Sequence, residues 1–276
     1  MPDSAPPRLG FSVDTLLPRA RGGGVLKMGL VRLDECEWLQ PNPARALRAA
    51  AFAAHPDAVQ VLPEAEPAGA ELAAMLGVAG GLAGAARSYW EDMCLLTRRE
   101  GEAAYRLTGG AVAFPTDWRL HDKIGLPLTE VHKPIHGYRE QLSAGVDNFM
   151  NGLAPHTIYG RANWFVVASD ALRYLPEDPP QERFAHVTAA NAGETLIVRS
   201  ERQTLRRLPE TGAIVFTIGV YLAPLGSLSD ENVARLAAAV EGVSAGESER
   251  RSAPHYAEAL RAYAQSRHPS SAGSVS

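Results

Sequence analysis

Two consecutive strand-like runs constrain this chain more than any other feature of its sequence. Residues 194–208 and 213–222 are long enough for extended strands, and they are joined by Pro209-Glu210-Thr211-Gly212. Proline and glycine in a short connection favour a reversal of the backbone, so the pattern predicts a β-hairpin. The second run is nearly all apolar, which indicates a buried strand.

The first run carries charges that a buried sheet tolerates only when they are paired. Strand alternation divides these side chains into one face with Arg199, Glu201 and Gln203 and another with Ser200, Arg202 and Thr204. Because an unpaired buried charge costs several kcal/mol, the pattern predicts a functional site or an internal Glu/Arg network. A one-residue change of register would exchange Glu201 and Arg202, so either could face a pocket.

Apolar periodicity predicts helices around this sheet. The spacing indicates helices over residues 44–54, 69–86, 138–153, 227–240 and 254–267. A shorter hairpin is expected where residues 102–107 and 111–114 flank Thr108-Gly109-Gly110. The glycine-rich run 77–84 has the wrong spacing for dinucleotide binding, and its small residues favour close helix packing. Helices around an antiparallel sheet make an α+β fold.

The length of 276 residues suits one principal domain with appendages, large enough to enclose a sizeable cofactor. Residues 1–24 are rich in proline, glycine and arginine and predict a flexible N-terminal arm. The small polar residues 266–276 predict a disordered tail. Residues 25–265 are expected to form a single domain with helical additions.

Composition excludes several classes of protein. A hydrophobic share of 46% with 21% charged residues excludes wholesale disorder, and a net charge of −4 gives no basic footprint for nucleic acid. Glycine and proline interrupt the longest uncharged stretch, residues 211–229, and the N-terminus lacks a signal-peptide pattern, so we expect no membrane segment and a cytoplasmic location. Cys36 and Cys94 are too few for a disulfide framework.

The densest cluster of polar and aromatic residues is the segment 118–138, which contains His132 and His136. Neutral imidazole is a common iron ligand, and Val131 and Ile135 supply apolar flanks of the kind found beside haem. The alternative is a loop in which both histidines bond to the backbone. Cofactor motifs of other kinds are missing, so we expect no flavin or iron–sulfur site in this chain.

A third candidate segment is Arg161-Ala162-Asn163-Trp164, which opens an apolar strand. A guanidinium forks onto a carboxylate, so Arg161 could anchor a propionate, and Asn163 could add a neutral contact. They could equally cap a turn, with Trp164 filling the core.

Taken in order, several short motifs make the chain similar to a known family. These are Trp90-Glu91-Asp92-Met93-Cys94-Leu95-Leu96, Tyr105-Arg106-Leu107, Phe114-Pro115 with Trp118, Lys123-Ile124-Gly125, Val131-His132-Lys133-Pro134-Ile135, Arg161-Ala162-Asn163-Trp164 and Glu201-Arg202-Gln203-Thr204-Leu205. Over about residues 25–225 the chain resembles the haem-dependent oxidative N-demethylases, the α-subunit type of dimethylamine monooxygenase.

The resemblance implies a PAS-like α+β domain, with an antiparallel sheet and surrounding helices enclosing a pocket for haem b. It also implies activation of O2 and oxidation of a small N-methyl amine to formaldehyde and the shorter amine. The electrons would come from a separate flavin and iron–sulfur reductase. The Arg-rich composition leaves a larger amine open as the substrate.

By motif position, the resemblance implies that His132 is the metal ligand. Catalytic candidates are Glu201, as acid/base or amine anchor, and Arg202. The other expected cofactor contacts are His136, Lys123, Arg161, Asn163, Trp164 and Arg199. His136 stands where the family usually has a second proline and could be a second iron ligand, a proton donor or part of a changed loop. Alternative functions are a haem-binding PAS-type sensor without turnover and a haem-free scaffold subunit.

Overall fold

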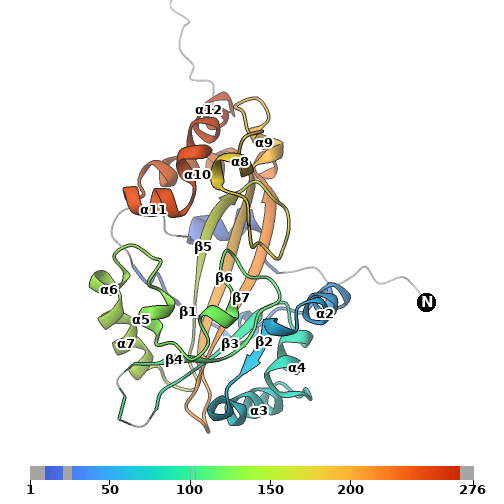
Figure 1. Cartoon of the computed structure of the whole chain (residues 1–276), viewed down its shortest axis with the longest axis vertical. Coiled ribbons are helices and arrows are strands. Elements are labelled where there is room, and N and C mark those ends of the chain that lie inside the picture. Colours follow the sequence, from blue (N-terminus) through green and yellow to red (C-terminus); the bar gives the residue numbers. More distant parts are fainter. Residues whose placement is uncertain (1–9, 21–26, 100, 103, 268–276) are drawn as a thin grey trace, which may run out of the picture.

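The computed structural model describes residues 10–20, 27–99, 101–102 and 104–267. Within these residues the chain forms a seven-stranded antiparallel sheet with helices packed around it, which confirms the α+β class (Figure 1). Across the sheet the strand order is β1-β5-β6-β7-β3-β4-β2. The strands are β1 (Val31–Leu33), β2 (Val59–Val61), β3 (Asp92–Thr97), β4 (Arg106–Ala111), β5 (Ile158–Val167), β6 (Ile197–Arg207) and β7 (Ile214–Pro224).

The predicted hairpin 194–222 is confirmed as the pair β6–β7 at the centre of the sheet. Leu208 N–H donates to Ala213 O at 2.8 Å and closes the connection, in which Gly212 has φ +70°. Such a backbone conformation suits glycine because it has no Cβ. The other edge of β6 pairs with β5, and this register places Asn163 directly opposite Glu201.

The predicted hairpin over residues 102–114 is wrong. Residues on both sides of the expected turn belong to one continuous strand, β4, which pairs with β3 on one edge and β2 on the other. The glycine pair has a packing role instead. A Cβ on Gly110 would lie 2.5 Å from Leu120 Cδ1, so the side chain of Leu120 packs directly over the strand backbone.

The helices follow the predicted periodicity, with two interruptions. The helix predicted over 69–86 is divided into α3 and α4 around Gly77 and Gly80, which have φ +66° and +89°. The helix over 138–153 is divided near Leu142. The helices are α1 (Val13–Leu16), α2 (Arg45–Ala54), α3 (Glu66–Met75), α4 (Gly81–Ser88), α5 (Leu128–Val131), α6 (Tyr138–Gln141), α7 (Ser143–Gly152), α8 (Pro180–Arg183), α9 (Ala192–Thr195), α10 (Asp230–Glu241), α11 (Ala245–Arg250) and α12 (Ala257–Arg267).

Part of the predicted N-terminal arm is ordered. Val13 and Leu16 of α1 are buried in the main core, and Asp14 Oδ1 accepts hydrogen bonds of 2.9 Å from the backbone and hydroxyl of Ser229. The arm prediction is therefore wrong for residues 10–20, while residues 1–9 and 21–24 lie outside the described residues. At the other end, α12 continues through Ser266 to Arg267, and residues 268–276 lie outside them as well.

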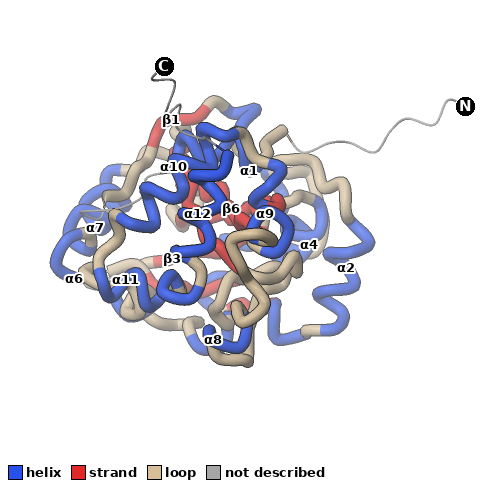
Figure 2. The backbone as a smooth tube through the Cα atoms, turned by 90° about the horizontal axis from the view of Figure 1, so that it is seen from above, coloured by secondary structure: helices blue, strands red, loops and turns tan. Residues whose placement is uncertain are grey.

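The two faces of the sheet pack into different clusters. On β3, Met93 and Leu95 belong to a large core shared with α1–α4, whereas Cys94 and Leu96 belong to a smaller one shared with α5 and α7. Helices α8–α12 gather at one end of the sheet (Figures 1 and 2). None of the helices described is long and apolar enough to cross a membrane.

Candidate functional site

A cavity of about 2180 Å³ lies on the α5–α7 side of the sheet. Its walls come from β5 and β6, from the segment 116–142 and from α10–α11, which is far along the chain. Pockets for single small ligands usually measure roughly 300–1,000 Å³. This one therefore has room for a large prosthetic group together with a small substrate.

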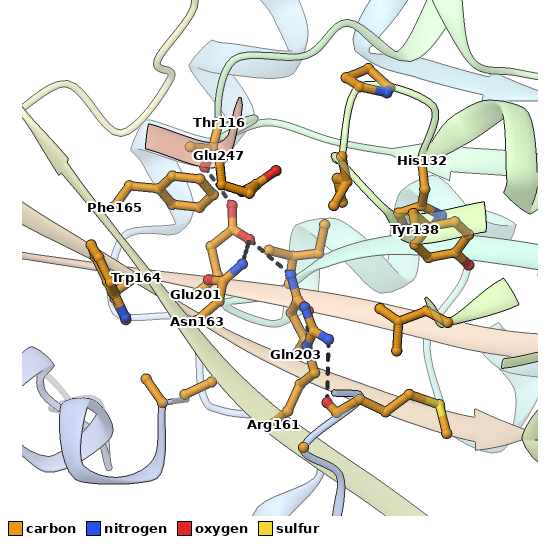
Figure 3. Close-up of a pocket in the computed structure, with 18 of the residues that line it drawn as sticks. Thr116, His132, Tyr138, Arg161, Asn163, Trp164, Phe165, Glu201, Gln203 and Glu247 are labelled. Atoms are coloured by element: carbon orange, nitrogen blue, oxygen red, sulfur yellow. Dashed lines mark hydrogen bonds between the residues drawn. The ribbon is translucent and has the colours of Figure 1, made fainter. Parts of the chain in front are cut away.

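Glu201 lies in this wall and is surrounded by neutral hydrogen-bond donors. Thr116 Oγ1 donates to Oε1 at 2.5 Å, and Oε2 accepts from Asn163 Nδ2 at 3.0 Å and from Gln203 Nε2 at 2.8 Å (Figure 3). The strand register explains the arrangement, since Asn163 pairs with Glu201 across the ladder and Gln203 is the next side chain on the same face.

This environment leaves the carboxylate of Glu201 with unused capacity. A carboxylate oxygen has two lone-pair sites, so Oε1, which binds only Thr116, retains one acceptor site. No cationic side chain among the described residues lies within 4 Å of Glu201. Beside it, Asn163 Oδ1 is buried without a hydrogen-bond partner in the described part of the chain. The cluster is suited to a cationic hydrogen-bond donor.

His132 follows the short helix α5 and lines the same cavity. Its Nδ1 lies 2.8 Å from Leu128 O, and its ring stacks on Tyr138 with centroids 4.4 Å apart and planes inclined by 15°. The carbonyl is an acceptor, so Nδ1 carries the proton and Nε2 keeps its lone pair. Metal-binding histidines commonly have this second contact, which fixes the ring and its tautomer.

Burial keeps His132 neutral. Desolvation is the main effect that lowers the pKa of His132 to about 4, and the positive charges of Arg161 and Lys123 lower it further against the Leu128 hydrogen bond. At neutral pH, Nε2 of His132 is therefore unprotonated. These properties fit the iron ligand of a haem protein, because His is a usual axial ligand.

Lys123 and Arg161 place positive charge close to this histidine, and both line the cavity. Lys123 Nζ donates to Val131 O, while Arg161 donates from Nε to Gln203 Oε1 at 2.9 Å and from a terminal nitrogen to Met28 O at 3.2 Å. Burial lowers the pKa of both groups. Two cations held in a partly buried wall are suited to the carboxylates of a prosthetic group.

His136 also lines the cavity but is more exposed than His132. Its backbone N–H donates to Glu247 Oε1 at 3.2 Å, and a Cβ on Gly246 would lie 2.6 Å from its ring. The loop 132–136 is thus packed against α11, and the described structure brings both histidines to one cavity.

Two predicted site residues, Arg199 and Arg202, need correction. Arg199 is fully buried beneath the site and binds Thr116 Oγ1 at 2.6 Å and the carbonyls of four residues, Phe114, Pro115, Ala171 and Leu172. Arg202 projects to the opposite face, where it binds Trp38 O at 3.3 Å and lies 3.8 Å from Glu91. Neither lines the cavity, so both arginines belong to the internal network. Trp164 is among the residues that line the cavity, while its ring packs in the main core and points away from Glu201 (Figure 3).

Several residues of the site were not predicted. Thr116 and Phe165 lie next to predicted segments and Tyr138 ends the segment 118–138, but only the folded chain brings them to Glu201 and His132. Alternation had placed Gln203 on the face of Glu201, and this signal alone could have identified it. Glu247 gave no signal, because it lies on a short helix, 40 residues after the end of β6.

The chain matches a known family over the part that contains most of these residues. The family model described as haem-dependent oxidative N-demethylase, alpha subunit-like, matches residues 80–261, from the start of α4 into α12. The match contains Glu201, His132 and most of the residues that line the cavity, and it suggests a haem-dependent oxidative N-demethylase-like function. With most of its length matched, the chain belongs to the haem-dependent oxidative N-demethylase, alpha subunit-like, family.

Proposed function

We propose that this protein binds haem b in the cavity through His132 and oxidises the N-alkyl group of an amine held by Glu201. One observation carries the proposal: a neutral imidazole with a free Nε2 lines the same large cavity as a carboxylate that, among the described residues, has no cationic side chain within 4 Å. Lys123 and Arg161 are proposed to hold the propionates, with Asn163 and Gln203 supporting Glu201. Electrons would come from a separate flavin and iron–sulfur reductase.

When bound, haem would supply the redox chemistry that activates O2. The chain's own residues hold and orient the substrate. A protonated secondary amine has two N–H donors, and one can bind the free acceptor site on Glu201 Oε1. This contact offsets the ammonium charge and fixes the position of the adjacent C–H bonds. The bonds from Thr116, Asn163 and Gln203 keep the carboxylate in one orientation.

The apolar part of the wall limits access of water to the reacting atoms. Phe165, Phe216 and Ile218 line the cavity beside the polar cluster on the same face of the sheet. A carboxylate–ammonium contact is stronger in such surroundings than in water. The site therefore offers a polar anchor at one point and an apolar enclosure for an alkyl group.

The test is an ultraviolet–visible spectrum of haem-loaded protein, before and after addition of secondary amines. A stoichiometric Soret band that shifts with amine, and that is lost in His132→Ala, supports the proposal. His136→Ala is the matched control, because it removes a second histidine from the same loop. Its band should remain.

Other outcomes are equally informative. A band that is kept in His132→Ala and lost in His136→Ala would overturn the ligand assignment. Haem binding without any amine-induced shift or formaldehyde release would contradict the enzymatic proposal and favour a sensor. Failure to bind haem under any loading condition would leave a scaffold.

A further inference from the structure

A pair of arginines at the end of α11, Arg250 and Arg251, faces the cavity, and among the described residues the two form ion pairs with a single carboxylate, that of Glu247. Glu247 binds Arg250 through two hydrogen bonds, from Nε at 2.9 Å and from a terminal nitrogen at 2.8 Å. The same carboxylate lies 3.4 Å from Arg251 Nε. Glu247 thus neutralises one of the two guanidinium groups, and the other charge remains.

The arginine pair is fixed in position by aromatic rings and the backbone. Arg251 lies 4.7 Å from the ring centre of Trp164 and 5.1 Å from that of Phe165, and it donates to Trp164 O. Arg250 lies 5.9 Å from the ring centre of Phe165. Guanidinium groups stacked in this way lose little further freedom when they bind a ligand.

The positive charge at this wall is not fully balanced by its surroundings. Burial lowers the pKa of Arg251, and the charge of neighbouring Arg250 is the next largest effect in the same direction, ahead of the opposing effect of Glu247. Asp117 also lines the cavity, but its carboxyl group interacts electrostatically with Arg183 as well as with Arg250. Its negative charge is therefore shared with an arginine outside the pair. Arg251 Nε is paired with Glu247 at 3.4 Å, but this contact does not have the geometry of a hydrogen bond in the described part of the chain.

The arginine pair lies beside the proposed amine anchor. Phe165, which contacts both arginines, is two residues from Asn163 on the same face of β5, a separation of about 7 Å along a strand. Figure 3 shows Phe165 and Glu247 on the same side of the cavity as Glu201 and Thr116, with His132 and Tyr138 across from them. An anchored amine could therefore reach the pair with a group several bonds away.

We propose that the arginine pair binds a carboxylate carried by the substrate, so that the substrate is an N-alkyl amino acid with separated amine and carboxylate groups. This inference rests on the proposed function. Guanidinium groups match the geometry of carboxylates, and a substrate anion would supply the missing counter-charge. A haem propionate is a second possible source of the same chemistry, and the experiment distinguishes the two.

The probes are 4-(methylamino)butanoate and its neutral amide, 4-(methylamino)butanamide, which share one amine and one shape. Calorimetric titration of the haem-loaded wild-type protein should give a Kd about tenfold or more lower for the acid than for the amide. In Arg251→Met the two Kd values should become equal, with haem content unchanged. Arg251→Lys should restore part of the difference, because it keeps the charge but loses the fork.

The matched control is Arg235→Met, which removes a cavity-lining arginine that already pairs with Glu231 at 2.7 Å. It should keep the preference for the acid. Equal affinities of the wild type for both probes would overturn the inference without any variant. Loss of haem in Arg251→Met, with acid and amide affected alike, would assign the arginine pair to a propionate. Either result leaves the proposed function intact, provided that the wild-type protein still binds haem and amine.

Discussion

At the scale of single residues, Glu201 and His132 line the same cavity but differ in what they can bind. Glu201 keeps a free acceptor site because Oε1 binds only Thr116, whereas His132 keeps a lone pair at Nε2 because burial disfavours a second proton and the Leu128 carbonyl holds the first proton on Nδ1. The two groups are proposed to act on different molecules, a substrate cation and a prosthetic group. Their effects should therefore be separable by substitution.

Glu201→Gln tests this separation. The amide keeps the shape but loses the charge, so we expect haem binding to be unchanged and amine affinity to fall by about tenfold or more. The measurement is the amine dependence of the Soret shift. Glu210→Gln, the same chemical change in the exposed turn after β6, is the control and should match the wild type. Equal weakening in both variants would contradict the role given to Glu201.

At the scale of secondary-structure elements, glycines allow backbone atoms to pack closely where one helix ends and the next begins. Gly84 in α4 faces Ala79 O so closely that an added Cβ would lie 1.7 Å from it. Gly145, inside α7, has nothing within 4 Å of the same position. The two positions make a matched pair, since both are helical glycines.

Gly84→Ala is expected to destabilise the protein by about 1–3 kcal/mol or more, because backbone atoms must move to admit the methyl group. Gly145→Ala should be neutral or stabilising by up to about 1 kcal/mol, because alanine favours the helix. Urea unfolding of both variants measures the difference. A Gly84→Ala protein as stable as the wild type would mean that the α3–α4 turn can relax.

The same scale separates what the sequence could predict from what it could not. Alternation identified the faces of β6 and the central hairpin, because those patterns are local. The glycines of β4 resembled a turn, since nothing local indicates that Leu120 covers them. Arg199 and Arg202 were predicted as site residues because charges on a buried strand indicate a functional site or an internal network. The sequence could not separate the two, because distant segments decide which side of the sheet contains the cavity.

At the scale of the whole molecule, the sheet separates two polar regions. The cavity occupies one side, and a buried cluster around Glu91 lies on the other, where Gln40 N–H binds the carboxylate at 3.1 Å and Arg202 lies 3.8 Å away. Desolvation raises the pKa of Glu91 to about 7, against the effects of Gln40, Arg202 and Arg48. Tyr221, whose hydroxyl has no partner among the described residues, lies in the field of the same carboxylate.

This cluster predicts a pH dependence of global stability. The unfolded chain releases the Glu91 proton near the ordinary pKa of 4.5 and the folded chain near 7, so the contribution of Glu91 is fully present below 4.5 and lost as pH rises through 7. The loss is on the order of 3 kcal/mol. Glu91→Gln should remove it, and the measurement is the free energy of unfolding of wild type and variant at pH 5 and pH 7.5.

Only the difference between the two proteins matters here, because other groups titrate in the same range. The stability of the wild type relative to Glu91→Gln should decrease over this interval. A constant difference would show that Glu91 is ionised in the folded protein throughout, held by Arg202. Glu210→Gln again serves as the control for the loss of a carboxylate.

The contact between His136 N–H and Glu247 joins segments that are 111 residues apart in the chain. During synthesis on a ribosome, the loop with His132 emerges well before α11. The part of the cavity wall that α11 forms is absent until α11 follows. The prosthetic group would then be retained only after α11 has left the exit tunnel. Truncated chains that end before α11 should accordingly lose haem rapidly, even with the histidine loop intact.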